Sequence, residues 1–531
     1  MIGMAGVGVM TRLAIRRSRL LIGSWIAAFV VIAAVSADAT VGLYPSLRSQ
    51  IAAGDTFNRS QALLALYGRV YDPRSVGSLA LVKLSGLGSV FVAMLAVVLV
   101  VRHTRADEEA GRLELVGATA TDRRAPVTAA LALVVATNVV LGILTTAALV
   151  ATGLPVGGSI AFGLSWAGVG LVFGAVAAVT AQIATSARTA TAQAAGVLGV
   201  VYALRAVGDA VGAGGPRWLT WLSPIGWAQQ IRPYAGNRWW VLVVTLGAAL
   251  VIGGGAVAIA ARRDLGTGLL AARPGPPRGA VRLGSPLGLA WRLQRTAFAG
   301  WAVAFLFLGV LVGGLAASVG DFVNNPTARE IFRELGGRHG LTDAFLAFEL
   351  AFAGIIASAY GIQAVMRLPA EESSGRAEPV LATAVGRIRW ALGHVVVAAG
   401  GVTALMLLVG VGAGITRAVA VGRAGEAGRV IAAALVQIPA AWVLVGIMVA
   451  AFGLVPRFVV TGWIALAAFV LLGELGPLLG LDQWAMDLSP FAHVPKLPGG
   501  AFTAGSVAAL TAIAAVLAVA GLTGLRRRDI M

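Results

Sequence analysis

The sequence contains no cysteine, only two lysines among 41 basic residues, and only 12% charged residues in a chain of 531. Soluble globular chains carry roughly 25% charged residues. The lack of cysteine excludes disulfide bonds, thiolate metal sites and a cysteine nucleophile. The scarcity of charge, together with 58% hydrophobic residues, excludes an ordinary water-soluble fold.

The sequence also lacks the motifs of an enzyme. No Gly-x-x-x-x-Gly-Lys-Ser/Thr phosphate cradle is present, and neither Lys83 nor Lys496 stands in such a setting. The four histidines show no spacing typical of metal ligands or of a nucleophile relay: His103, His339, His394 and His493. We therefore expect a chain without catalytic residues, without a metal site and without a bound cofactor.

Long apolar runs dominate what remains. A bilayer core about 30 Å thick accepts a helix of roughly 20 apolar residues whose backbone hydrogen bonds all close internally. Twelve such runs are expected, at residues 20–43, 79–101, 126–152, 159–183, 192–211, 239–261, 297–319, 345–366, 391–415, 430–454, 458–479 and 501–525. The predicted fold is an all-α integral membrane protein of about twelve transmembrane helices.

A segment rich in Gly, Pro and Arg separates two sets of six runs. We expect a first six-helix half at residues 1–265, a cytoplasmic linker at 266–282 and a second six-helix half at 283–531. Because each half holds an even number of spans, the two repeats are expected to be parallel, related by an axis along the membrane normal.

The positions of the arginines predict the topology. Several arginines precede the first run and three follow the last, at Arg526–Arg528. We therefore expect a multi-pass protein of the plasma membrane with both termini in the cytoplasm. The net charge of +18 would suggest nucleic acid in a soluble protein. Here the arginines lie in short runs between apolar segments, where orientation signals and lipid headgroups explain them, so no nucleic-acid partner is expected.

The two halves repeat each other in sequence. A basic amphipathic lead-in precedes the first span of each half, with Arg16 and Arg19 in one copy and Arg292 and Arg295 in the other. The two halves also end alike, with Arg262-Arg263-Asp264 in one and Arg527-Arg528-Asp529 in the other. A duplicated unit shows which residues each half needs at matching places.

The most distinctive repeat follows the second span of each half. It reads Asp-Glu-Glu-Ala-Gly-Arg-Leu-Glu at residues 107–114 and Glu-Glu-Ser-Ser-Gly-Arg-Ala-Glu at residues 371–378. Glu108 and Arg112 are four apart, as are Glu372 and Arg376, a spacing that allows ion pairs on a helix. One interpretation is a solvated, self-paired helix. The other is a docking helix whose charged face meets a cytoplasmic partner while Leu113, Leu115 and Val116 pack on the bundle.

These repeated loops, the basic lead-ins and the count of six plus six spans resemble the ATP-binding-cassette permeases that export polyketide antibiotics, the tetronasin-type class. The resemblance implies export of hydrophobic or amphipathic compounds, driven by two copies of a separate cytoplasmic ATPase that binds ATP and Mg. It also implies a set of coupling residues in the two loops: Glu108, Gly111, Arg112, Glu114, Glu372, Gly375, Arg376 and Glu378.

Acidic residues within apolar spans usually face a cavity or a partner. Asp209 and Glu474 lie late in the fifth span of each half, and we predict that they lie near the outer mouth of a pathway, with Arg205 able to neutralise Asp209. An acid at the outer interface is the alternative. Trp227 belongs to a tryptophan-rich segment that suits either an outer lid or interfacial anchoring.

Two other functions stay open at this point. A proton-driven secondary transporter of the major facilitator type also has two parallel six-span halves. Against it, the loop after the second span is long, and Asp122-Arg123-Arg124 lacks that family's Gly-x-x-x-Asp-Arg-x-Gly setting. A non-transporting membrane partner of an ATPase is the second alternative.

Overall fold

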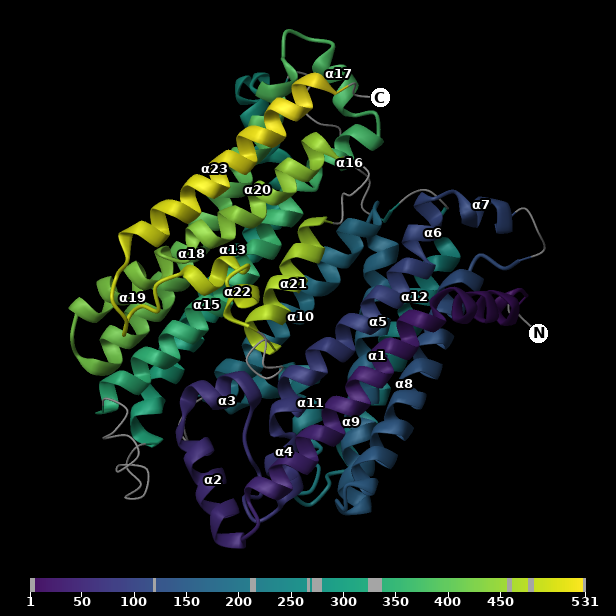
Figure 1. Cartoon of the computed structure of the whole chain (residues 1–531). Helices are drawn as coiled ribbons and strands as arrows, with labels where there is room; N and C mark the ends of the chain where they lie inside the picture. Colours follow the sequence, from purple (N-terminus) through teal and green to yellow (C-terminus); the bar gives the residue numbers. More distant parts are fainter. Residues whose placement is uncertain are drawn as a thin grey trace. The chain divides into compact units, whose positions relative to one another are not determined.

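A computed structural model of the chain describes residues 5–117, 121–210, 216–264, 268–269, 279–322, 337–455, 461–475 and 482–528. Their regular structure is entirely helical (Figure 1), and eleven of their helices are long and apolar enough to cross a membrane. The prediction of an all-α integral membrane protein is confirmed. Of the remaining expected span, residues 458–479, the structure describes only the short apolar helix α21 (Thr461–Leu475).

The chain divides into two compact units, Met1–Gly275 and Pro276–Met531, which we describe separately. The helices of the first unit are α1 (Val7–Leu43), α2 (Leu47–Arg59), α3 (Gln61–Tyr67), α4 (Val76–Lys83), η1 (Leu84–Gly88), α5 (Ser89–His103), α6 (Arg105–Glu109), α7 (Arg112–Gly117), α8 (Ala125–Ala151), α9 (Val156–Ile183), α10 (Ala187–Ala210), η2 (Arg217–Leu222), α11 (Pro224–Gln230) and α12 (Trp240–Arg262).

The helices of the second unit are η3 (Val281–Gly284), α13 (Pro286–Phe322), α15 (Gly337–Val365), α16 (Arg367–Ser373), α17 (Ala377–Leu381), α18 (Arg387–Val421), α19 (Gly425–Leu435), α20 (Ile438–Leu454), α21, α22 (Gln483–Met486), η5 (Pro490–His493) and α23 (Ala504–Arg527).

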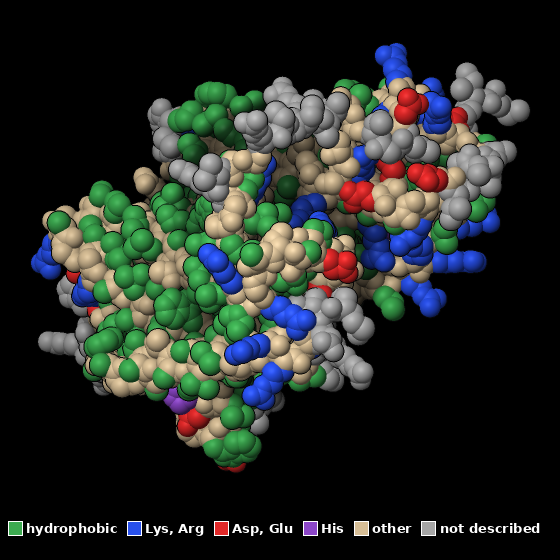
Figure 2. All heavy atoms as spheres, turned by 90° about the horizontal axis from the view of Figure 1, so that it is seen from above, with side chains coloured by type: hydrophobic (Ala, Val, Ile, Leu, Met, Phe, Trp, Pro, Cys, Tyr) green, Lys and Arg blue, Asp and Glu red, His purple; other side chains and the backbone are tan. Residues whose placement is uncertain are grey.

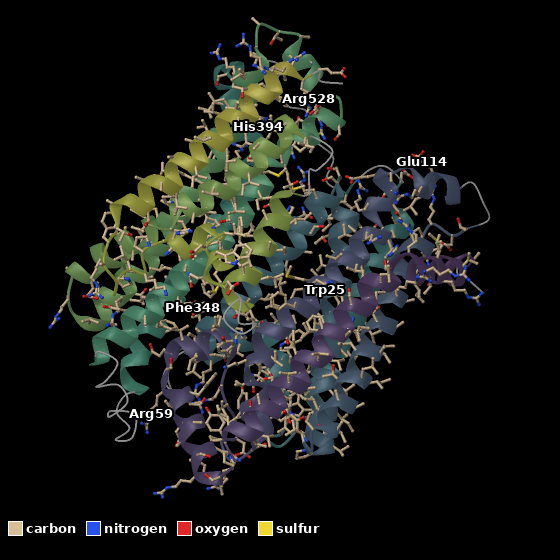
Figure 3. The ribbon with its side chains drawn as sticks, in the orientation of Figure 1. Trp25, Arg59, Glu114, Phe348, His394 and Arg528 are labelled. Carbon is tan, nitrogen blue, oxygen red and sulfur yellow. The ribbon has the colours of Figure 1, made fainter. Side chains whose placement is uncertain are left out.

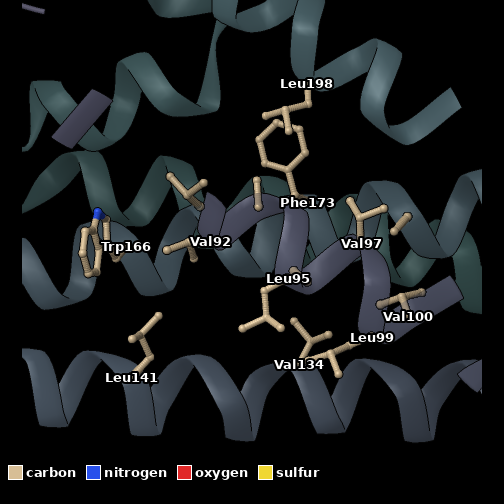
Figure 4. Packing of buried hydrophobic residues seen from close by; sticks show 14 of the residues in the cluster. Val92, Leu95, Val97, Leu99, Val100, Val134, Leu141, Trp166, Phe173 and Leu198 are labelled. Carbon is tan, nitrogen blue, oxygen red and sulfur yellow. The ribbon is translucent and has the colours of Figure 1, made fainter. Parts of the chain in front are cut away.

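The core of the first unit lies around α9, which α5, α8 and α12 all contact. Figure 4 shows Leu95 of α5 facing Val134 of α8, while Trp166 and Phe173 of α9 pack on the other side of α5. These side chains are all nearly inaccessible. Because lipid is as apolar as leucine, close packing rather than hydrophobic exclusion holds such helices together.

The second span of the first unit contains a π-helical turn. Helices α4 and α5 join through η1 and, together with α6, form a candidate span of 34 residues, Val76–Glu109. A π turn leaves backbone groups that the regular helical ladder no longer pairs. The indole of Trp166 donates a hydrogen bond to the carbonyl of Leu84 at 3.1 Å, which supplies a partner at the start of the turn.

In the second unit α13 runs along α18, and α20 runs along α23. The second pair meets backbone to backbone, because a Cβ atom placed on Gly453 would lie 1.8 Å from the carbonyl oxygen of Gly521. Small residues permit such close approach between membrane helices. No side chain separates α20 from α23 at this crossing.

The first helix of each unit is much longer than a span. Helices α1 and α13 each contain 37 residues, or about 55 Å at 1.5 Å per residue, so the lead-in and the span form one helix. Ser18 and Gln294 are buried at matching places on the two lead-ins. The four arginines of the predicted lead-ins, Arg16, Arg19, Arg292 and Arg295, are exposed.

Candidate functional site

We call residues 107–114 the first acidic loop and residues 371–378 the second acidic loop. In the first unit α6 and α7 lie at the end opposite α2 and α3 (Figure 1). Figure 3 places Glu114 at that end and Arg59 at the other. In the second unit Arg528 lies near α16 and α17, while Phe348 of α15 lies farther along the bundle.

Both acidic loops turn at a glycine. Gly111 has φ +69° and Gly375 has φ +68°, in the left-handed region that residues with a Cβ rarely adopt. A Cβ atom would meet nothing within 4 Å at either position, so the backbone conformation alone requires glycine. Each glycine separates two short helices, α6 from α7 and α16 from α17.

This turn changes the expected ion pairs. The expectation that Glu108 pairs with Arg112, and Glu372 with Arg376, assumed one continuous helix and is wrong. Arg112 instead contacts Asp107 at 2.6 Å, and the Nε atom of Arg376 donates to the hydroxyl of Ser374 at 2.8 Å. The interrupted helix no longer places residues four apart on one face.

The two glutamates instead contact the last helix of their own unit. Glu108 pairs with Arg263, which follows α12, at 2.6 Å, and with Arg105 at 3.0 Å. In the second unit Glu372 pairs with Arg528, which follows α23. The Glu108 pair is almost fully buried, with side chains 6% and 7% exposed. The same Glu–Arg contact therefore occurs at matching places in both units.

A second repeated contact lies beside the first. Arg123 pairs with Asp264 at 3.3 Å in the first unit. Its counterpart Arg387 donates to the backbone carbonyl of Arg528 at 2.5 Å in the second. In each unit, two side chains of the segment between the second and third spans thus contact the end of the last helix.

The first acidic loop has additional contacts that fix it to α1 and α10. Asp107 accepts two hydrogen bonds from Arg17 of α1, at 2.7 and 3.1 Å. Such bidentate contacts are the stronger kind of ion pair. Glu109 accepts a hydrogen bond from the backbone N–H of Ala187, the first residue of α10, at 3.0 Å. In the second loop Glu371 instead pairs with Arg367, one turn earlier in α16, at 3.0 Å.

The loops also present charge outward. Arg112, Glu114, Arg376 and Glu378 are exposed, whereas Leu113 and Ala377 beneath them are buried. The side chains of Leu115 and Val116 lie outside the described residues. A shallow cavity of about 510 Å³ borders the second loop between Glu378 and Arg387. Figure 2, which shows the molecule from above, shows acidic and basic side chains lying side by side.

The acid predicted in the fifth span is neutralised. Asp209 contacts Arg205 at 3.4 Å and accepts a hydrogen bond from Thr220 at 3.0 Å. Arg205 is completely buried and also donates to the carbonyl of Leu66 at 3.1 Å. Trp227 donates to the carbonyl of Trp221 at 2.6 Å and is half-buried. The side chain of Glu474 lies outside the described residues.

The second unit contains a wide, mainly apolar cavity of about 790 Å³. One wall is formed by α15, including Phe348 and Ile355, and another by Phe469 of α21. Asp343 and Lys496 are the charged residues of its lining. Pockets for drug-sized molecules have volumes of roughly 300 to 1,000 Å³ and mostly apolar walls with a few polar groups.

Histidines do not form a metal site in the part of the chain that the structure describes, where no group of three or more His, Asp or Glu residues converges. His103 shares a 2.8 Å hydrogen bond with Ser18, and His394 a 3.1 Å hydrogen bond with Gln294. Both histidines thus contact the lead-in helix of their own unit.

Sequence reasoning missed the residues that hold the acidic loops, above all Arg17, Arg105 and Arg367. Arg263 and Arg528 were visible as a repeated ending of the two halves, but nothing in the sequence linked them to Glu108 and Glu372. The signal that could have found them is joint repetition, since both partners recur at matching places.

The fold and the repeated loops define an all-α integral membrane protein with duplicated charged elements at one end of each unit. Residues 283–526 match the family model described as "Multidrug efflux system permease Rv1217c, C-terminal domain". The chain is 40% identical, over 99% of its length and 96% of the relative's, to the multidrug efflux system permease protein Rv1217c of Mycobacterium tuberculosis (strain ATCC 25618 / H37Rv). The chain belongs to this family of multidrug efflux system permeases.

Proposed function

We propose that this chain is the membrane-spanning permease of an ATP-driven exporter that moves hydrophobic or amphipathic, drug-like compounds out of the cell. ATP and Mg bind to two copies of a separate cytoplasmic ATPase of the ATP-binding-cassette class, and this chain binds neither. Both termini then lie in the cytoplasm of a plasma-membrane protein. The name of the relative supports efflux through a permease, and the resemblance of the loops supports the tetronasin-type class.

The observation that carries this proposal is the repeated acidic loop with its Glu–Arg contact to the last helix. An ATPase subunit docked on Arg112 and Glu114, or on Arg376 and Glu378, would press on an element that cannot move alone. Separating Glu108 from Arg263 would break a buried ion pair, which is strongly unfavourable. A displacement of the loop is therefore passed to α12 in one unit and to α23 in the other.

The apolar cavity of the second unit supports the proposed class of cargo. Phe348, Ile355 and Phe469 offer the hydrophobic contacts that an uncharged or amphipathic compound requires. The polar groups at the cavity are few, which is typical of sites that orient a ligand while burying most of its surface. We place the cargo-binding site of the second unit here.

Attachment of the ATPase is tested with the exposed members of the loops. In the double variant Glu114→Lys/Glu378→Lys, the ATPase that copurifies with the permease should fall at least tenfold, because the outward charge of both docking elements is reversed. Glu108 and Glu372 are poor choices for this test, since they hold the loops to the bundle and their loss would mix docking with stability.

The matched control is Asp55→Lys, which reverses an exposed acid on α2 at the opposite end of the first unit. Both proteins should insert and purify equally well, and only the double variant should lose the ATPase and drug export. Undiminished copurification in the double variant contradicts the docking assignment. Export by the purified permease alone, abolished by a protonophore, would instead favour the proton-driven alternative.

A further inference from the structure

A second cavity lies in the first unit, at the end opposite the acidic loops. Its volume is about 460 Å³. Five arginines from four segments of the chain line it, and we call it the arginine cavity: Arg59, Arg69, Arg217, Arg232 and Arg238. Figure 3 places Arg59 at this end of the unit, far from Glu114.

The charges of the arginine cavity are unbalanced. Its lining contains one acid, Asp209, which already pairs with Arg205 and accepts a hydrogen bond from Thr220. Among the described residues, none of the five arginines of the lining forms an ion pair. Like charges held close together repel, and an anion between them would reverse that repulsion into attraction.

The walls of the cavity are held in place by side-chain hydrogen bonds. The amide of Asn58 both donates to and accepts from the backbone of Val70, at 2.9 and 3.0 Å. Gln230 donates to the hydroxyl of Tyr71 at 2.8 Å. The guanidinium of Arg232 lies over the ring of Tyr71, 4.4 Å from its centre. A site whose walls are fixed beforehand loses less entropy when it binds a ligand.

Arg232 has a donor directed to no protein acceptor. Its Nε atom is buried and has no hydrogen-bond partner. Burial lowers the pKa of Arg232; the Tyr71 hydroxyl opposes this, whereas the nearby charges of Arg238 and Arg69 add to it. A buried donor among other cations is unfavourable unless an acceptor comes to it. Arg232 thus brings a guanidinium that no carboxylate of the described residues neutralises to the wall of the arginine cavity.

The turn that carries Arg232 is strained. Arg232, Tyr234 and Asn237 all have positive φ angles, of 53°, 61° and 36°. Such conformations are uncommon for residues other than glycine and persist only where the surroundings fix them. Here Tyr234 shares a 2.8 Å hydrogen bond with Ser159, and its backbone N–H donates to Asn237. Strain of this kind concentrates at sites that bind ligands.

Tryptophans beside the cavity indicate an amphipathic ligand. Trp218 follows Arg217 directly, and Trp239 and Trp240 follow Arg238. All three are exposed, by 62%, 45% and 54%. Exposed tryptophans are typical of the membrane–water interface, where their rings lie among lipid headgroups. Trp221 lines the cavity and stacks on Trp240, so the arginine cavity adjoins an apolar surface that suits acyl chains.

We propose that the arginine cavity binds the anionic phosphate headgroup of an amphipathic molecule whose apolar part lies along the tryptophan surface. The cavity is larger than a single phosphate and accommodates a headgroup with its glycerol. This site is lined by residues of the first unit alone, at the end of that unit opposite the first acidic loop, and it requires neither ATP nor the ATPase. Its test is therefore independent of the proposed export function.

Binding is measured on the full-length permease in detergent with three water-soluble probes. They are dihexanoyl phosphatidylglycerol, which is an anionic amphiphile, dihexanoyl phosphatidylcholine, which is a zwitterionic one, and inorganic phosphate. Titrations followed by tryptophan fluorescence should give phosphatidylglycerol an affinity at least tenfold higher than either other probe. In Arg69→Gln/Arg232→Gln this preference should disappear.

The matched control is Arg48→Gln, which removes an exposed arginine of α2 outside the cavity and should keep the preference. Helix content by circular dichroism and elution as a single species verify that the double variant is folded. A misfolded double variant is replaced by the single variant Arg69→Gln, whose exposed side chain tolerates change. Equal binding by the cavity variant and the Arg48 control overturns the proposal. Phosphate binding as tightly as phosphatidylglycerol overturns its amphiphile part.

Discussion

The two acidic loops have the same backbone conformation at their glycines, but they differ in the side-chain contacts that fix them to the bundle. Both turn at a left-handed glycine and both pair a glutamate with the arginine that ends the last helix. The first loop is also fixed to α1 through Arg17. At the matching place in the second lead-in stands Leu293, which cannot form this contact. The duplication has thus preserved the link to the last helix while the link to the first helix occurs in one unit.

The sharpest way to break this comparison is to remove the glutamates. Glu108→Ala leaves Arg105 and Arg263 buried without their carboxylate, and we expect a loss of about 3–5 kcal/mol in the stability of the first unit. Glu372→Ala should cost less, about 1–3 kcal/mol, because its pair is more exposed. Thermal unfolding of the two purified variants measures the difference.

A charge exchange controls for the loss of the side chain itself. Glu372→Arg/Arg528→Glu restores opposite charges at the same place and should recover more than half of the stability that either single substitution loses. Equal melting temperatures for the Glu108→Ala and Glu372→Ala variants would mean that burial does not distinguish the two contacts.

A test at the glycines should show likeness rather than difference. Gly111→Ala and Gly375→Ala each force a Cβ into left-handed backbone, which costs roughly 1–2 kcal/mol. The two losses in unfolding free energy should agree closely. Gly386→Ala is the control, because its Cβ also meets nothing within 4 Å while its φ of −70° suits any residue. If Gly111→Ala left the free energy of unfolding unchanged, the left-handed turn would not be what requires glycine there.

The smallest effect is expected at the contact that only one unit has. Arg17→Leu introduces the residue of the second lead-in, and Asp107 keeps its contact with Arg112. We expect a loss of about 1 kcal/mol or less, since Arg17 is 30% exposed. Hydrogen exchange of residues 105–114 should quicken, while that of residues 367–378 should stay unchanged. Unaltered exchange in both loops would show that Arg17 does not restrain the first one.

The spans were predictable because hydropathy depends on local sequence, and a run such as residues 159–183 has one stable form in lipid. The length of α1 and α13 was not predictable, because a basic lead-in can either continue the helix of the span or form a separate helix at an angle to it. The glycines of the acidic loops were recognised as repeated, but their left-handed turn, and hence the loss of the Glu108–Arg112 pair, required the backbone. The arginine cavity escaped prediction because its arginines come from four separate segments.

The proposed assignments of the loops to coupling, and of Asp209 to a pathway, stay predictions. Among the three pairs predicted from a spacing of four residues, Arg205 with Asp209 is the one that the structure contains. For charges that pair across helices, such as Arg17 with Asp107, sequence distance gave no indication.

The backbone contact between Gly453 and Gly521 has a mechanical meaning. Because the backbones of α20 and α23 touch at this crossing, we expect the two helices to move together there. Arg528, which follows α23, holds Glu372 and also donates to the carbonyl of Phe452, near the end of α20. A displacement of the second acidic loop is therefore expected to reach α20 and α23 at once through Arg528.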